Sequence, residues 1–175
     1  MTAADAYDLT TQGGATALAR LIEVCESLGP YCVMGDFAVD CYVEPVYTLD
    51  ADLVVIASNL LKLVERLKEQ GFKIEQHPHS VNAWPPGSKL RIQFTTDPRF
   101  QEFVTRSVEA EVLGVRARVA CLEDVTRGKL WAYRDPRRRL SKRQKDKLDL
   151  IRLAEANPKL KSTYPPELRA EIERG

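Results

Sequence analysis

Two segments in the first third of the chain decide the fold: VMGDFAV, residues 33–39, and TLDADLVV, residues 48–55. The first segment predicts a short buried strand that ends at Gly35 and turns directly into a helix. The second predicts another strand, because it is rich in β-branched residues. Side chains two residues apart in a strand point to the same face, so Asp50 and Asp52 place two carboxylates side by side.

This pair of carboxylates predicts a cation. Two unit charges roughly 5 Å apart repel by about 3 kcal/mol at an effective dielectric constant of ~20. Hard oxygen ligands of this kind favour Mg²⁺ or Mn²⁺ over zinc. The alternative interpretation is a solvent-exposed strand whose aspartates bind nothing, because the D-x-D pattern is common.

The remaining segments predict a mixed α/β fold with a helical carboxy-terminal part. Residues 1–14 are expected to form a loose lead-in, residues 15–121 an α/β core, and residues 122–175 helices packed on that core. Residues 77–89, with two prolines and a glycine, are predicted to be a loop. Residues 108–121 are predicted to form a hairpin around Gly114, although the first half could equally finish a helix. Hydrophobic periodicity predicts helices over 15–28, 37–43, 59–70, 122–133, 141–156 and 167–174, and strands over 31–34, 49–56, 72–76 and 90–95.

Charge is distributed unevenly along the chain. The whole sequence has 26 basic and 25 acidic residues, a net charge of +1. Residues 1–56 carry nine acids and one base, a sum of −8, whereas residues 127–147 carry ten bases and two acids, a sum of +8. An acidic and a basic segment that face each other suit a site for metal ions and phosphates. The alternative is that they only form salt bridges across the surface.

Length, composition and cysteine content predict a single soluble cytoplasmic domain. The chain has 175 residues, of which 44% are hydrophobic and 29% charged, a balance typical of globular proteins. Its four cysteines form no C-x-x-C pair, and its two histidines, His77 and His79, are expected on the surface, so no zinc site is predicted. No apolar run approaches the roughly 20 residues that cross a bilayer, and we expect no membrane contact.

Taken together, these segments resemble the DNA polymerase β-type nucleotidyltransferase superfamily. Residues 33–39 and 48–53 are similar to its glycine turn and its paired aspartates. The segments GKLWA, residues 128–132, and KRQKDKLDL, residues 142–150, are similar to its lysine at a helix start and its R-x-K-D-x-x-D helix. The resemblance spans roughly residues 15–155, and within the superfamily it is nearest to the AbiEii-like nucleotidyltransferases, many of which are toxins of toxin–antitoxin pairs.

The resemblance implies a metal-dependent enzyme that moves a nucleoside monophosphate from an NTP to an acceptor hydroxyl. It implies Mg²⁺ or Mn²⁺ as cofactor, an NTP as substrate, and tRNA, a protein or a small molecule as acceptor. A cognate antitoxin or toxin protein would be the further partner. The implied site consists of Gly35, Asp36 and Thr48 for the nucleotide, Asp50 and Asp52 for metal, Lys129 for the phosphates, and Asp146, with Asp149 as the alternative, as the carboxy-terminal aspartate.

The sequence departs from the family pattern at two positions. Asp36 stands where the superfamily has a serine or glycine, and a carboxylate there repels a triphosphate unless it binds metal or points away. Gln93 stands where many active members carry a third carboxylate, and an amide can ligate Mg²⁺ but contributes no charge. The alternative function is therefore a catalytically weakened nucleotide-binding protein, or an antitoxin-type interaction protein, on the same fold. Two tryptophans could stack a base: Trp84, and Trp131, which is expected in the core.

Overall fold

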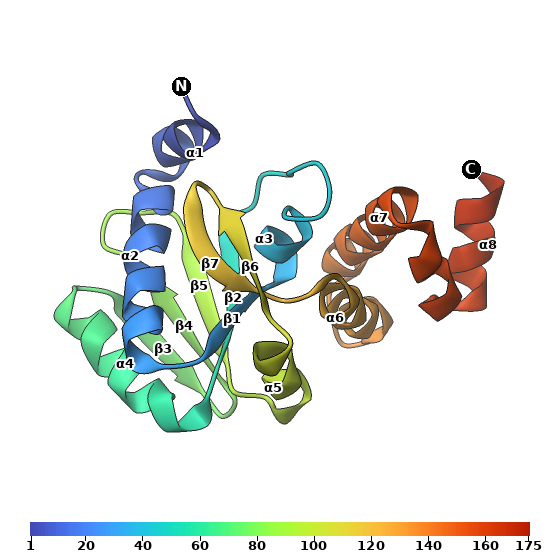
Figure 1. The fold of residues 1–175 in the computed structure, drawn as a ribbon. Helices are drawn as coiled ribbons and strands as arrows, with labels where there is room; N and C mark the ends of the chain where they lie inside the picture. The colour runs from blue at the N-terminus through green and yellow to red at the C-terminus, as the bar shows by residue number, and fades with distance from the viewer.

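The computed structural model describes all 175 residues and has a seven-stranded mixed β-sheet at its centre (Figure 1). The strands lie in the order β3-β4-β5-β2-β1-β7-β6. The strand β2 is central, because it pairs with β1 in antiparallel and with β5 in parallel orientation. The strands are β1 (Tyr31–Met34), β2 (Asp50–Val55), β3 (Lys73–His77), β4 (Ser80–Trp84), β5 (Arg91–Thr95), β6 (Val108–Val112) and β7 (Val115–Val119).

Helices lie on both sides of the sheet. Figure 1 shows α2 and α4 on one side and α3, α5 and α6 on the other, with α7 and α8 extending beyond α6. This arrangement confirms the predicted mixed α/β fold with a helical carboxy-terminal part. The helices are α1 (Ala3–Thr11), α2 (Gly14–Leu28), α3 (Gly35–Val39), α4 (Ala57–Glu69), α5 (Pro98–Thr105), α6 (Leu122–Arg134), α7 (Leu140–Ala156), the 3-10 helix η1 (Pro158–Thr163) and α8 (Pro166–Arg174).

The alternation of side chains along β2 separates the core from the polar site. Ala51, Leu53 and Val55 are buried on the face opposite to Asp50 and Asp52. Because the opposite face of the strand is covered by apolar side chains, the two carboxylates are held on a rigid central strand. No helix is long and apolar enough to cross a bilayer, and all four cysteines are unpaired.

The expectation of a loose lead-in over residues 1–14 is wrong. The helix α1 forms there because Thr2 and Asp5 make a capping box, in which each side chain accepts a hydrogen bond from the other residue's backbone N–H. The hydroxyl of Tyr7 then donates a hydrogen bond of 2.6 Å to the carbonyl of Thr48. The helix is thereby tied to the residue that precedes β2.

The predicted loop over residues 77–89 is also wrong in its first half. The strand β4 pairs with both β3 and β5, and its alternating Val81 and Ala83 are buried. The prolines come only after the strand ends at Trp84.

The helix α5 was not predicted, although Asp97 caps it and Pro98 occupies its first turn. The helix predicted over 37–43 begins earlier and ends earlier, as α3. The predicted hairpin over residues 108–121 is confirmed by the pairing of β6 with β7.

Candidate active site

The turn from β1 into α3 brings the backbone against the carboxylate of Asp52. Gly35 has a φ of +68°, a left-handed conformation that favours glycine. A Cβ atom at Gly35 would lie 2.4 Å from Asp52 Oδ2, which is closer than any real Cβ contact. Met34 is the β1 partner of Asp52, so the register of the two strands creates this approach. Gly35 is therefore required both by the turn and by the carboxylate beside it.

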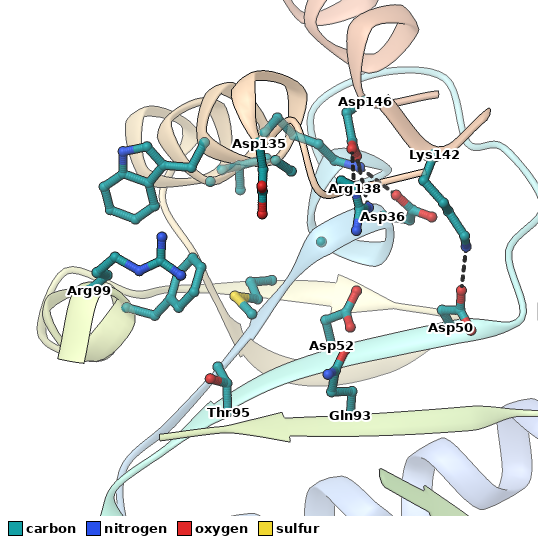
Figure 2. Close-up of a pocket in the computed structure, with 18 of the residues that line it drawn as sticks. Asp36, Asp50, Asp52, Gln93, Thr95, Arg99, Asp135, Arg138, Lys142 and Asp146 are labelled. Atoms are coloured by element: carbon teal, nitrogen blue, oxygen red, sulfur yellow. Dashed lines mark hydrogen bonds and ion pairs between the residues drawn. The ribbon is translucent and has the colours of Figure 1, made fainter. Parts of the chain in front are cut away.

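A cavity of about 620 Å³ opens between the sheet and the carboxy-terminal helices (Figure 2). Its floor is formed by the polar face of β2 and β5, where Asp52 pairs in register with Gln93 and Asp50 with Arg91. Its opposite wall is formed by α6, the start of α7 and the connection between them. The acidic and the basic segments of the chain thus face each other across one cavity, and ion pairs also link them, so both interpretations of the charge distribution apply in part.

Both carboxylate oxygens of Asp50 are engaged by cations. Arg91 Nε donates to Oδ1 at 2.9 Å, and Lys142 Nζ donates to Oδ2 at 3.0 Å. Burial acts to raise the pKa of Asp50, but these two cations outweigh burial and lower it below its usual range. Asp50 is therefore charged and compensated in the absence of any ligand.

Asp52 has no such partner. It lines the cavity, half-buried, and no hydrogen bond or ion pair involves its carboxylate. Burial, together with the nearby carboxylate of Asp36, raises the pKa of Asp52 to about 6. An unpaired carboxylate that opens into a cavity beside two others favours a bound cation.

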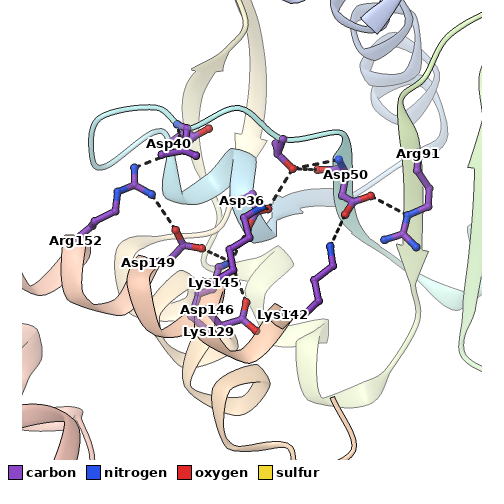
Figure 3. A network of polar contacts seen from close by, with 12 residues as sticks. Asp36, Asp40, Asp50, Arg91, Lys129, Lys142, Lys145, Asp146, Asp149 and Arg152 are labelled. Atoms are coloured by element: carbon purple, nitrogen blue, oxygen red, sulfur yellow. Dashed lines mark hydrogen bonds and ion pairs between the residues drawn. The ribbon is translucent and has the colours of Figure 1, made fainter. Parts of the chain in front are cut away.

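Lys129 lies in a buried cluster of three carboxylates (Figure 3). Its Nζ is 2.6 Å from Asp36 Oδ1, 3.2 Å from Asp146 Oδ1 and 2.7 Å from Asp149 Oδ2. Burial alone would lower the pKa of Lys129, but the surrounding carboxylates raise it, and the ammonium stays charged. Lys129 donates hydrogen bonds to Asp36 and Asp146, whereas its contact with Asp149 Oδ2 is an ion pair without a hydrogen bond.

The sequence left open whether Asp146 or Asp149 belongs to the site. Both side chains are buried and both contact Lys129, but only Asp146 lines the cavity. Asp146 also accepts a hydrogen bond of 2.6 Å from Arg138 Nε. Asp149 instead pairs with Arg152 at 2.9 Å, on the side away from the cavity lining. The geometry therefore favours Asp146 as the aspartate of the site.

Asp36 and Thr48 are held in place by contacts within the protein. Asp36 is bound by Lys129 and Lys145, whose charges overcome the effect of burial and hold the pKa of Asp36 well below its usual range. Thr48 is buried outside the cavity lining, donates to Asp36 Oδ2 at 3.2 Å and accepts from the backbone N–H of Asp50 at 3.2 Å. Thr48 thus orients the first residue of β2 together with Asp36.

The structure adds residues to the site that were not assigned from the sequence. Lys142, Lys145 and Arg138 reach the carboxylates from α7 and from the loop before it. The sequence signal for Lys142 and Lys145 was their helical spacing, because residues three apart on a helix share a face. Arg138 precedes the helix and had no such signal.

The far end of the cavity has an aromatic wall. Trp131 stacks on Phe103, with ring centroids 5.9 Å apart, and contacts Phe100 edge-on at 5.4 Å. The guanidinium of Arg99 lies over both Phe100 and Trp131. Trp131, expected in the core, therefore contributes to the cavity as well as to packing.

The other candidates lie outside the cavity lining. His77 forms an exposed pair with Glu75 at 3.1 Å, and His79 lies in the turn between β3 and β4. Trp84 packs under Lys73 at the edge of the sheet. None of these three side chains shares a surface with the carboxylates.

The donor set is compatible with magnesium but not with a metal held by protein alone. No group of three or more His, Cys, Asp or Glu side chains is arranged to hold a metal ion. Mg²⁺, however, is commonly bound by one or two carboxylates together with substrate phosphates and water. Asp50 and Asp52 supply those two carboxylates at the floor of a cavity of about 620 Å³. The residues present therefore fit a metal ion that binds together with a triphosphate.

Comparison with solved structures identifies the architecture. The antibiotic-resistance factor ANT(2″)-Ia, in complex with adenylyl-2″-tobramycin, superimposes with a TM-score of 0.63 at 14% identity, over 91% of this chain and 96% of that one. The lincomycin-bound lincosamide antibiotic adenylyltransferase LnuA gives a TM-score of 0.58 at 15% identity, over 81% and 97% of the two chains. The chain has a nucleotidyltransferase fold.

A third similar structure is an antigenic nucleotidyltransferase-like protein from Paracoccidioides brasiliensis, with a TM-score of 0.56 at 18% identity over 90% and 91% of the chains. No family model matches the sequence, and no curated protein matches it. At these identities the likeness concerns the fold, and it agrees with the predicted superfamily architecture. The AbiEii-like subfamily stays a prediction.

Proposed function

We propose that this protein is a metal-dependent nucleotidyltransferase that moves a nucleoside monophosphate from an NTP to an acceptor hydroxyl. One observation carries the proposal: Asp50 and Asp52 lie side by side on a central strand, at the floor of a cavity whose opposite wall is basic. Acids for a metal on one wall and bases for phosphates on the other are the two components that phosphoryl transfer requires. The shared fold of the solved nucleotidyltransferases supports the same reaction class.

In the proposed reaction, the acceptor oxygen forms a bond to the α-phosphorus as the bond from that phosphorus to the bridging oxygen breaks. Pyrophosphate leaves, and the hydroxyl proton passes to water or to a carboxylate of the site. Asp50 and Asp52 would hold Mg²⁺ or Mn²⁺, which when bound supplies charge neutralisation for the triphosphate. Gly35 keeps the backbone close to Asp52, and Asp146 holds Arg138 and Lys129 in position on the opposite wall.

Lys129 was predicted to contact the nucleotide phosphates, but we propose a different role for it. Because the Lys129 side chain is only 7% exposed and its ammonium lies among Asp36, Asp146 and Asp149, we assign Lys129 to positioning these carboxylates rather than to direct phosphate contact. Asp36 is paired with Lys129 and Lys145, and its charge is therefore compensated rather than free to repel a triphosphate.

The second candidate function is nucleotide binding without transfer, as in a sensing or antitoxin-type protein. Gln93 favours it, since this neutral residue pairs in register with Asp52 where a third carboxylate would add charge. The acceptor, whether tRNA, a protein or a small molecule, and the partner in a toxin–antitoxin pair stay predictions of the resemblance.

Transfer of label from each α-³²P-labelled NTP in the presence of Mg²⁺ tests the proposal, with total tRNA and a panel of hydroxyl compounds as acceptors. We expect the wild type to label an acceptor and Asp52→Asn to lose at least about 100-fold in rate, as is typical when a group that stabilises the transition state is removed. Asp97→Asn, at a carboxylate outside the cavity lining, is the matched control and should stay active. Metal-dependent NTP binding without any transfer would support the second candidate instead.

A further inference from the structure

Two lysines of α7 form ion pairs with carboxylates of the candidate site, one of which is a predicted metal ligand. Lys142 and Lys145 lie three residues apart, on one face of the helix, and each reaches a carboxylate from the amino-terminal half of the chain. We propose that these two lysines act as exchangeable counterions: they neutralise Asp50 and Asp36 in the free protein and turn to the phosphates when a metal–NTP complex binds. This inference rests on the proposed function.

The contacts define the first half of the exchange. Lys142 Nζ is 3.0 Å from Asp50 Oδ2, and Lys145 pairs with Asp36 Oδ2 (Figures 2 and 3). The remaining oxygen of Asp50 is held by Arg91, its register partner on β5. Arg91 remains beside Asp50 as its register partner, and Lys142, which reaches Asp50 from α7, is the cation that the proposal exchanges.

Lys142 and Lys145 differ from Lys129 in how much of the side chain is exposed to solvent. The side chains of Lys142 and Lys145 are 33% and 34% exposed, whereas that of Lys129 is 7% exposed. A flexible four-carbon stem at the mouth of a cavity can redirect its ammonium at little cost. Lys129, enclosed by three buried carboxylates, cannot move without taking one of its cations from each of them.

The charges of the free cavity balance, and the two lysines can offset the charge of an incoming metal–NTP complex. In the free protein, Arg91 and Lys142 pair with Asp50 and Lys145 pairs with Asp36, so these three cations equal the summed charge of Asp36, Asp50 and Asp52, although Asp52 has no direct partner. A metal–NTP complex of Mg²⁺ and a tetra-anionic triphosphate brings a net charge of about −2 into the cavity. The two lysine charges then offset that complex, while Asp50 keeps Arg91, Asp36 keeps Lys129, and the metal ion lies beside Asp50 and Asp52.

The exchange also leaves the apolar packing intact. The helix α7 packs mainly on α6 and η1, and it reaches the region around α3 and β2 through long side chains. Since these contacts are ion pairs rather than core packing, they can be replaced one for one by contacts to phosphate.

Direct measurement of Mn²⁺ binding by electron paramagnetic resonance, without nucleotide, tests the first half of the exchange. Lys142→Gln should bind Mn²⁺ about fivefold more tightly than the wild type, because a competing cation is removed from Asp50. Lys147→Gln is the matched control: it removes the same charge from α7, but Lys147 pairs with Glu171 away from the cavity lining. It should bind Mn²⁺ like the wild type.

Titration calorimetry with a non-hydrolysable NTP and saturating Mg²⁺ tests the second half. Here Lys142→Gln and Lys145→Gln should each bind about tenfold more weakly than the wild type and Lys147→Gln, because a charged contact to phosphate is lost. The opposite signs for Lys142→Gln in the two titrations are the signature of exchange. Circular dichroism confirms that each variant is folded, and Lys142→Met serves in place of Lys142→Gln should the latter unfold.

The outcomes separate this inference from the function on which it rests. If the wild type binds no Mn²⁺ either with or without NTP, or if Asp52→Asn binds it equally well, the metal site and the proposed function are wrong. If Mn²⁺ binding depends on Asp52 but Lys142→Gln equals Lys147→Gln in both titrations, the exchange alone is overturned. Weaker binding of both Mn²⁺ and NTP by Lys142→Gln also overturns it, because Lys142 would then support the metal site instead of competing for it.

Discussion

At the scale of single residues, Gly35 is the position where the backbone and the site constrain each other most directly. A side chain there meets two penalties: a φ of +68° and a contact of 2.4 Å with Asp52. We expect Gly35→Ala to lower the free energy of unfolding by about 3 kcal/mol, since the left-handed conformation alone costs about 1 kcal/mol and the displaced carboxylate adds to it. Urea unfolding measures the loss.

Gly87→Ala separates the cost of the left-handed backbone conformation from the cost of the contact with Asp52. Gly87 has a similar φ of +73°, but a Cβ there has no atom within 4 Å. It should lose only the conformational part, about 1 kcal/mol. Equal losses in the two variants would show that the approach of Gly35 to Asp52 carries no energy.

At the scale of an element, α7 is a helix organised by charge on one side. Five charged residues follow one another along this side, and each forms an ion pair with a charged group of another element or of α7 itself: Lys142, Lys145, Asp146, Asp149 and Arg152. Leu150, Leu153 and Ala154 of this helix are fully buried, whereas Leu140 and Leu148 are exposed. The helix therefore contributes a polar stripe to the cavity and an apolar stripe to the core.

The buried cation between α6 and α7 should be essential for stability. Lys129→Met removes the shared partner of Asp36, Asp146 and Asp149, and leaves three carboxylates in a buried place. We expect a loss of about 3–5 kcal/mol in the free energy of unfolding at pH 7, the usual cost of breaking a buried ion pair from one side. In guanidinium unfolding, Lys147→Met should cost under about 1 kcal/mol, because its pair is partly exposed. A Lys129→Met variant as stable as the control would show that the cluster is not a stabilising contact.

At the scale of the whole molecule, attraction between the acidic first third and the basic helices should make stability depend on pH. The pKa of Asp36 is lower in the folded state than the value of about 3.9 in an unfolded chain, because Lys129 and Lys145 outweigh burial. Its contribution is therefore present above pH ~4 and is lost as pH falls through the folded-state pKa. Between pH 6 and pH 3, Asp36→Asn should lose about 1 kcal/mol less stability than the wild type.

Thermal unfolding followed by circular dichroism across that range measures the difference. Glu109→Gln, which breaks an exposed pair with Arg116 on the far hairpin, should follow the wild type. Parallel pH profiles for Asp36→Asn and the wild type would mean that the two charged segments contribute no net attraction at this contact.

The sequence by itself determined the features that depend on local pattern. The strand with Asp50 and Asp52 was predictable because a period of two is set by the backbone of the strand alone. The turn at Gly35 and the helices α2, α4, α6 and α7 were predictable because their signals are also local. Apolar periodicity and helix-terminating residues act over a few neighbouring positions. Where a local signal was overlooked, as with the capping box of α1 and the alternation of β4, the prediction failed.

Only the tertiary structure decided which charged groups meet. Lys129 and Lys145 bind Asp36 across 93 and 109 residues of sequence, and Lys142 binds Asp50 across 92. The pattern alone indicated bases opposite acids, but it could not distinguish a buried lysine with three partners from two half-exposed lysines at the cavity mouth. That distinction arises because burial and pairing depend on how the sheet and the carboxy-terminal helices pack, and the strength of each ionic contact depends on the solvent left around it.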